Sequence, residues 1–209
     1  NVPVVACPNC GESYMTAATL HEIERIKLHR RSLAKKRSVA TVSFATGMAA
    51  IGAIMLTLTR AGDHVVASRY LFGNTASLFQ TLEAHGGDVT FVDATDAAAV
   101  EAAVTPRTRL VFVETIANPR TQVADLAGIG EVCARHGLVY VVDNTMTSPW
   151  LFRPATVGAS LVVNALTKYI GGHGNALGGS VTDTGLFDWT RYPAIHDAYK
   201  GANPKLWAV

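Results

Sequence analysis

Short apolar runs alternate with helical stretches through most of this chain, and this alternation limits the possible folds more than any other feature. Strands are predicted at 63–68, 89–92, 138–142 and 161–166, and in a run that begins at 110 and leads into a polar turn at 118–119. Helices are predicted at 44–59, 75–85, 96–104 and 125–136, with a short one before the last strand. Strands that are apolar on both faces and alternate with helices are typical of a parallel sheet. The sequence therefore predicts an α/β domain over residues 42–209, with a mostly parallel sheet flanked by helices.

The strand predicted at 161–166 leads to Thr167 and Lys168, at the start of a glycine-rich loop. Residues at the carboxyl ends of parallel strands face the crevice where such sheets bind ligands. Nearby glycines, which let backbone approach a ligand closely, are Gly171, Gly172, Gly174, Gly178 and Gly179. A lysine after a strand is most often a solvated strand end. An amine held in a dry, crowded pocket instead loses its charge more easily and can attack a carbonyl group.

Asp143 follows another apolar strand, at 138–142. On its own, a carboxylate in this position is interpreted as the cap of the next helix. Together with a lysine 25 residues later, also at a strand end, it matches the needs of pyridoxal phosphate. That cofactor requires a lysine for its aldehyde and a carboxylate that keeps its ring nitrogen protonated.

Two segments carry a family resemblance. Val-Val-Asp-Asn-Thr at 141–145 and Leu-Thr-Lys-Tyr-Ile-Gly-Gly-His at 166–173 resemble the Cys/Met-metabolism family of pyridoxal-phosphate enzymes, and the similarity extends over about 42–199. The family includes cystathionine γ-synthase, the O-acyl-homoserine sulfhydrylases and methionine γ-lyase. The resemblance implies the large domain of a fold-type I enzyme, which as a homo-oligomer performs γ-replacement or γ-elimination on an amino-acid substrate such as an O-acyl-homoserine.

The resemblance also implies roles for individual residues. Lys168 is the catalytic residue that bonds the cofactor and moves protons, and Asp143 holds the ring nitrogen. The phosphate is held by Gly47, Met48 and Thr167. From the residues alone, Gly47 and Met48 stand where a helix begins, and the unpaired amides of a helix start favour a phosphate. Small-Gly-small helix openings are also common without a ligand.

Two further residues are implied to face the cofactor ring. Phe72 stands where the family usually has a tyrosine, and it can stack on the ring but has no hydroxyl for proton transfer. Without the resemblance, a core aromatic is an equal alternative. Asn118 is implied to face the phenolic oxygen, although an asparagine before proline also suits a plain turn. Ala165 departs from the family, which usually has a phosphate-binding serine there.

Residues 1–41 differ in kind from the rest, with a net charge of +4 against −2 for the remainder. Cys7 and Cys10 form a Cys-x-x-Cys pair, which can supply two of the four ligands of Zn²⁺, and a basic helix is predicted from Thr16. The segment resembles half of an MqsA/YgiT-type zinc ribbon of antitoxin proteins. Two alternatives remain: a pair without metal, and a redox dithiol, which requires a helix directly after the cysteines. A regulatory protein that binds nucleic acid through this segment is the second functional hypothesis.

The apolar runs, the cysteine content and the two ends of the sequence limit where the protein can be located and how complete the domain can be. The longest apolar run, 48–56, is too short to span a bilayer, and three cysteines do not suggest a disulfide framework. We therefore expect a cytoplasmic protein. The sequence ends at Val209, before the domain that carries the substrate-carboxylate arginine in the resembled family, and the family's amino-terminal Tyr-x-Arg segment is not found. These differences predict an incomplete domain and argue against turnover by this chain alone.

Overall fold

The computed structural model describes residues 4–6, 13–15 and 39–193, and the chain divides into two compact units, 1–38 and 39–209. In the first unit, strands β1 (Val4–Ala6) and β2 (Ser13–Met15) pair antiparallel. A redox dithiol requires a helix directly after the two cysteines. Ser13–Met15 instead forms the strand β2, which argues against that alternative. Cys7, Cys10 and the basic helix predicted from Thr16 lie outside the described residues, so the zinc ribbon stays a prediction.

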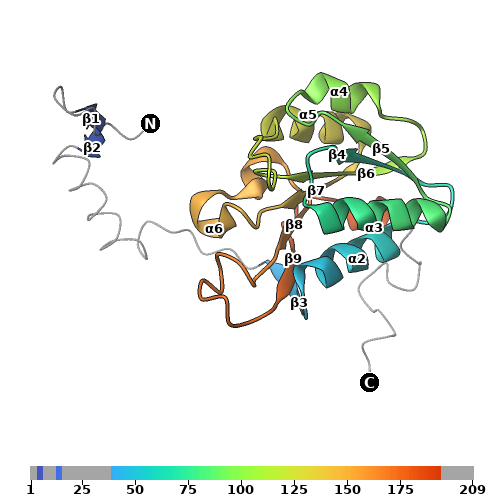
Figure 1. The fold of residues 1–209 in the computed structure, drawn as a ribbon. Coiled ribbons are helices and arrows are strands. Elements are labelled where there is room, and N and C mark those ends of the chain that lie inside the picture. Colours follow the sequence, from blue (N-terminus) through green and yellow to red (C-terminus); the bar gives the residue numbers. More distant parts are fainter. Residues whose placement is uncertain (1–3, 7–12, 16–38, 194–209) are drawn as a thin grey trace. The chain divides into compact units, whose positions relative to one another are not determined.

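The second unit contains a seven-stranded sheet in the order β3-β9-β8-β7-β6-β4-β5 (Figure 1). Its strands are β3 (Ala40–Phe44), β4 (His64–Ser68), β5 (Asp88–Val92), β6 (Thr108–Glu114), β7 (Val139–Asp143), β8 (Leu161–Asn164) and β9 (Gly179–Asp183). Neighbours from β5 to β8 run parallel, whereas β9 pairs antiparallel with both β8 and β3. The predicted mostly parallel sheet is confirmed.

Helices cover both faces of this sheet (Figure 1). They are α2 (Gly47–Leu58) and α3 (Gly73–Ala84) on one face, and α4 (Ala97–Ala102) and α5 (Leu126–His136) on the other. Alternate residues of β7 show the two layers: Val141 belongs to the apolar cluster of α2 and α3, and Val142 to the cluster of α4 and α5. Burial on both faces explains why these strands appear as continuous apolar runs in the sequence.

Local signals fix where the helices begin and end. The side chains of Thr46, Asp96 and Asp125 accept hydrogen bonds from first-turn amides of α2, α4 and α5. Gly137 ends α5 with φ +64°, a left-handed conformation that glycine adopts without strain. Shorter helices are α6 (Ser148–Leu151), η1 (Pro154–Val157) and η2 (Trp189–Arg191). Within the described ranges, every helix is too short or too polar to cross a membrane.

Two strands and one strand end differ from the sequence-based expectation. β3 and β9 were not predicted, because β3 is largely exposed and β9 begins within a glycine-rich stretch. A Cβ on Gly179 would run into the backbone of Thr46, so this glycine allows the close approach of β9 to the start of α2. β8 ends at Asn164 instead of Leu166, because the chain then forms a turn in which the Gly171 amide donates to the Leu166 carbonyl at 2.7 Å.

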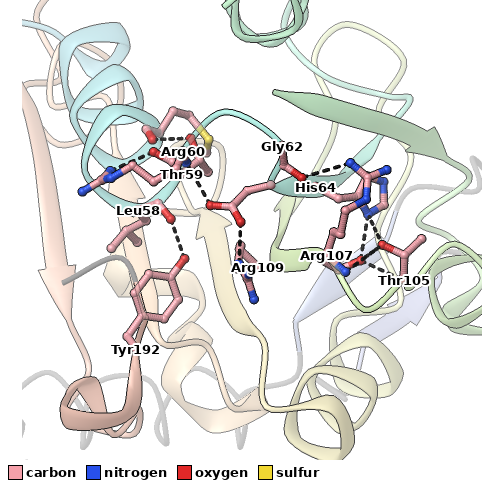
Figure 2. Close-up of polar contacts among 12 residues, drawn as sticks. Leu58, Thr59, Arg60, Gly62, His64, Thr105, Arg107, Arg109 and Tyr192 are labelled. Carbon is pink, nitrogen blue, oxygen red and sulfur yellow. Dashed lines mark hydrogen bonds and ion pairs between the residues drawn. The ribbon is translucent and has the colours of Figure 1, made fainter. Parts of the chain in front are cut away.

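Polar contacts fix the amino-terminal edge of the parallel strands (Figure 2). Asp63 accepts from the Arg60 amide at 2.9 Å and from Arg109 Nε at 2.7 Å. The ring of His64 lies 2.7 Å from Thr108 Oγ1, which joins the first residues of β4 and β6. These contacts tie the starts of two neighbouring strands together and so support the register in which their carboxyl ends emerge at the opposite edge.

Tyr192 anchors the segment after β9 to the carboxyl end of α2 (Figure 2). Its hydroxyl donates to the Leu58 carbonyl at 2.7 Å, and the ring is 3% exposed. Carbonyls in the last turn of a helix have no donor within the helix. We therefore expect Tyr192→Phe to lower the free energy of unfolding by about 1–2 kcal/mol, measured by urea denaturation. Tyr169→Phe, at a 62% exposed site, is the matched control and should have no effect.

Candidate active site

Two carboxyl groups lie side by side where β6 and β7 end. Glu114 and Asp143 are paired in the register of these parallel strands. Both project from the face that α2 and α3 cover, because Phe112 and Val141, two residues earlier on each strand, pack in the α2 and α3 cluster. The carboxyl edge of the sheet is thus acidic on the side where two long helices begin.

Asp143 is held in one orientation. Its Oδ1 accepts from the Thr145 amide at 2.9 Å and from Thr145 Oγ1 at 2.6 Å. The same hydroxyl accepts from the Ala165 amide at 2.8 Å, which links the end of β7 to the turn before Lys168. Burial raises the pKa of Asp143, and the two bonds from Thr145 oppose this. Among the described residues, Oδ2 has no hydrogen-bond partner, so it can receive a cationic N–H donor.

The start of α2 provides backbone donors on the same face. Thr46 Oγ1 accepts from the Ala49 amide at 3.0 Å, which leaves the amides of Gly47 and Met48 without an acceptor among the described residues. A Cβ on Gly47 would lie 2.7 Å from the Cβ of Ala165. Because Gly47 lacks a side chain, the helix start therefore lies directly against the chain that leads from β8 to Lys168, and it presents unpaired N–H groups there.

Phe72 and Asn118 lie on the loops that follow β4 and β6. Phe72 precedes the first residue of α3, and its ring is 41% exposed, so it is not a core aromatic. Asn118 is exposed and precedes a cis proline. Both backbone amides donate to one side chain, that of Glu114, at 2.7 and 3.1 Å.

Glu114 is the site residue that the sequence analysis missed. It is 7% exposed, and burial together with the nearby charge of Asp143 raises its pKa to about 7, against the effect of its two backbone hydrogen bonds. The only signal in the sequence is an acidic residue at the end of an otherwise apolar strand. Its two partners cannot be read from that position, because one of them is 42 residues away in the chain.

Lys168 and Thr167 lie in the turn after β8. The Lys168 amide donates to the Ala165 carbonyl at 3.1 Å, and the lysine is exposed. The dry, crowded pocket expected for this amine is therefore not formed by the described residues. Thr167 Oγ1 accepts from the Gly178 amide at 3.1 Å and donates to the Gly178 carbonyl at 3.3 Å. The glycine-rich loop thus folds back onto the turn that carries the lysine.

Comparison with known proteins identifies the family. The sequence profile of the family described as Cys/Met metabolism PLP-dependent enzyme matches residues 24–206. The chain belongs to this family. A canavanine gamma-lyase of Rhizobium leguminosarum bv. trifolii is 42% identical over 159 residues, which make up 75% of this chain and 40% of the relative. An O-acetyl-L-homoserine sulfhydrylase of Corynebacterium glutamicum is 42% identical over 78% of this chain and 38% of its own length.

Solved structures of Cys/Met-metabolism enzymes agree with the fold. The O-acetylhomoserine sulfhydrylase of Wolinella succinogenes has a TM-score of 0.72 and 44% identity, over 79% of this chain and 48% of that one. A putative O-acetylhomoserine (thiol)-lyase of Campylobacter jejuni, which contains N′-pyridoxyl-lysine-5′-monophosphate, has a TM-score of 0.68 and 32% identity, over 70% and 37%. The chain spans less than half the length of each of these four proteins.

The donors at this edge fit the cofactor of a PLP-dependent family. Pyridoxal phosphate has a dianionic phosphate at one end and a ring nitrogen that is cationic when protonated. Unpaired amides at the start of a helix favour an anion, and these are the Gly47 and Met48 amides. A fixed, partly buried carboxylate favours a cation, and Asp143 provides it on the same face of the sheet. Opposite charge preferences on one face match a ligand with opposite charges at its two ends.

Proposed function

We propose that this chain is the cofactor-binding part of a PLP-dependent enzyme of sulfur amino-acid metabolism. The proposed reaction is γ-elimination or γ-replacement on an O-acyl-homoserine or a related amino acid. The observation that carries the proposal is the oriented carboxylate of Asp143 on the same sheet face as the unpaired amides of α2. When bound, pyridoxal phosphate supplies an aldehyde for an amine and a ring that withdraws electrons from the substrate's α-carbon.

Asp143 is proposed to hold the cationic ring nitrogen through its free oxygen, while Thr145 keeps the carboxyl plane fixed. The amides of Gly47 and Met48 are proposed to hold the phosphate. The hydroxyl of Thr167 is proposed as a further donor, in exchange for its bond to the Gly178 carbonyl. Phe72 offers an exposed aromatic face for stacking, and Asn118 a side-chain amide for the phenolic oxygen. Fixing the ring at both ends restricts its motion during the reaction.

Lys168 is proposed as the catalytic residue. Its amine would condense with the cofactor's aldehyde in the resting protein, with loss of water. Once the amino group of a substrate had taken its place, the freed amine would take and return protons. The turn that carries it is fixed to Asp143 through Thr145 and Ala165. This connection would keep the amine near the carboxylate that orients the ring. The exposure of Lys168 suits an amine that must meet both a cofactor and a substrate.

The whole protein's partners are also proposals. We propose an amino-acid substrate, a homo-oligomer and a cytoplasmic location, as the family resemblance and the cysteine usage suggest. Large apolar side chains are exposed in α6, which follows β7, and in the stretch after β8 that contains the lysine turn, at Trp150, Leu151, Tyr169, Ile170 and Leu177. Side chains of this type are enriched at subunit interfaces, which supports an assembly in which further protein covers the lysine.

The proposal is tested by adding pyridoxal phosphate to the purified chain. We expect a visible absorbance band at one cofactor per chain, and borohydride should remove the band and fix the cofactor to the peptide that contains Lys168. Peptide mass spectrometry locates the adduct. An adduct spread over the basic segment at Lys27, Lys35 and Lys36, with no excess at Lys168, would refute the proposal, because exposed amines react with the aldehyde without a site.

Ala165 gives a prediction of improved binding. The Cβ of Ala165 faces the start of α2 at Gly47, so a hydroxyl added there can donate to a bound phosphate. One charge-assisted hydrogen bond contributes about 1–3 kcal/mol. We therefore expect Ala165→Ser to lower the Kd for pyridoxal phosphate by about fivefold to a hundredfold, measured by absorbance titration. Ala134→Ser, on the exposed side of α5, is the control and should leave the Kd unchanged. An unchanged Kd in Ala165→Ser would place the phosphate elsewhere.

A further inference from the structure

Glu114 joins the two loops that carry the proposed ring-facing residues. Its Oε1 accepts from the Phe72 amide at 2.7 Å, and its Oε2 accepts from the Asn118 amide at 3.1 Å. Phe72 precedes α3 and has no side-chain capping bond of its own, so the carboxyl group also fixes the start of that helix. One side chain thus sets the position of two segments that are otherwise separate in the sequence.

The carboxylate of Glu114 has no cationic partner within the part of the chain that the structure describes. Among the described residues no lysine, arginine or histidine forms an ion pair with it, although the side chain is only 7% exposed. A buried carboxylate without a counter-ion is costly. A glutamine or an apolar residue would avoid that cost if the position served packing alone. The two backbone bonds are what an ionised carboxylate can provide at this position and a neutral side chain cannot.

We propose that Glu114 is a positioning residue for the cofactor ring: when ionised it holds the Phe72 and Asn118 amides together, and when protonated it holds only one of them firmly. A protonated carboxyl has one strong acceptor oxygen, because the other carries the proton. The part of this inference that concerns the ring rests on the proposed function. The part that concerns the two amides does not, because both bonds are formed by the chain itself.

The surroundings of Glu114 favour this change of state near neutral pH. Burial and the charge of Asp143 on the neighbouring strand raise its pKa to about 7. On the other side, β4 ends in the uncharged Ser68, and the first turns of α2 and α3 contain no charged residue. Arg120, on the loop after Asn118, lies over the ring of Tyr70, whose hydroxyl donates to Asp93. Asp143 is therefore the charge that most directly affects Glu114.

The first test measures amide exchange by NMR in the full chain without cofactor, at pH 5.5 to 8.5. In the wild type, we expect the protection factor of the Phe72 amide, the Asn118 amide or both to rise by about tenfold with a midpoint near pH 7. Glu114→Gln should remove the rise, since a glutamine offers one acceptor oxygen at every pH. Asp143→Asn should move the midpoint to lower pH, and Glu131→Gln, at an exposed carboxylate of α5, should change nothing.

Global stability supplies an independent readout of the same carboxyl group. The pKa of Glu114 is about 7 in the folded chain, whereas in the unfolded chain it has its ordinary value of 4.5. Between these values only the unfolded state releases the proton, so stability falls as pH rises and is constant above the folded pKa. We expect the wild-type folding constant to lose about two orders of magnitude across this window relative to Glu114→Gln. Parallel pH profiles of wild type and Glu114→Gln would contradict the assignment.

The second test uses the loaded chain and separates the two hypotheses. In Glu114→Gln, we expect the Lys168 adduct to form while the visible circular dichroism of the bound cofactor falls by half or more, because the ring is no longer held by both loops. If Glu114→Gln forms the Lys168 adduct and shows the same circular dichroism as the wild type, Glu114 does not position the cofactor ring. Pyridoxal phosphate that forms no specific adduct even in the wild type would overturn the proposed function instead, and with it the ring-positioning role. If the protection factors of the Phe72 and Asn118 amides in the wild type do not change with pH, the proposal that Glu114 holds both amides is wrong.

Discussion

Lys168→Ala is expected to abolish the visible band of the reconstituted chain and the borohydride-stable adduct. The reason is chemical: Lys168, in the turn that is linked to Asp143 through Thr145 and Ala165, carries the amine proposed to condense with the aldehyde. Because the lysine is exposed, the substitution should change the free energy of unfolding by less than about 0.5 kcal/mol. A complete loss of signal with unchanged stability would therefore report chemistry rather than folding.

Lys168→Arg is the matched variant, because it keeps the positive charge but has no amine that forms the bond. We expect it to bind pyridoxal phosphate without the band, as a complex that dialysis removes. Lys200→Ala removes another lysine of the chain and should leave the band intact. The prediction fails if Lys168→Ala retains the band at one cofactor per chain, since a different amine would then be the partner of the aldehyde.

The positions of Asp143 and Lys168 beside strand ends were predictable from the apolar runs that precede them in the sequence: Asp143 ends β7, and Lys168 lies in the turn after β8. Each follows an apolar strand, and the ends of parallel strands meet at one edge of the sheet. The register adds what the sequence could not give, namely that Asp143 lies opposite Glu114 and is linked through Thr145 to Ala165. Such contacts depend on pairing between strands, and no local pattern encodes them.

The missed features share a dependence on distant parts of the chain. β9 is a strand because it pairs with β8 and β3, while its own sequence, Gly-Ser-Val-Thr-Asp, has a weak strand pattern. The exposure of Lys168 depends on what covers the turn, and none of the described residues does so. Glu114 is buried beside the loop at Phe72, which follows β4, whereas Glu114 itself ends β6. In each case, packing that is remote in the sequence decides the local environment.

Asp143→Asn is expected to have opposite effects on the unloaded and the loaded chain. Asparagine keeps the shape, and its Oδ1 can still accept both bonds from Thr145. Burial raises the pKa of Asp143 in the folded chain, so the ionised group costs stability as pH rises above its unfolded value. Replacing it with a neutral amide should make the unloaded chain more stable at pH 7.5, measured by urea denaturation, with a difference that vanishes at low pH where both forms are neutral.

Although Asp143→Asn should stabilise the unloaded chain, it should weaken the binding of pyridoxal phosphate. Removing one partner of a buried, hydrogen-bonded charge pair costs about 3–5 kcal/mol, so we expect the Kd for pyridoxal phosphate to rise by about two to four orders of magnitude in Asp143→Asn. Asp96→Asn is the control, because asparagine caps a helix as well as aspartate does, and it should change neither quantity. A purely structural aspartate would behave differently, since its removal would destabilise the unloaded chain. Higher stability combined with weaker binding is the result that identifies Asp143 as a group kept for its ligand.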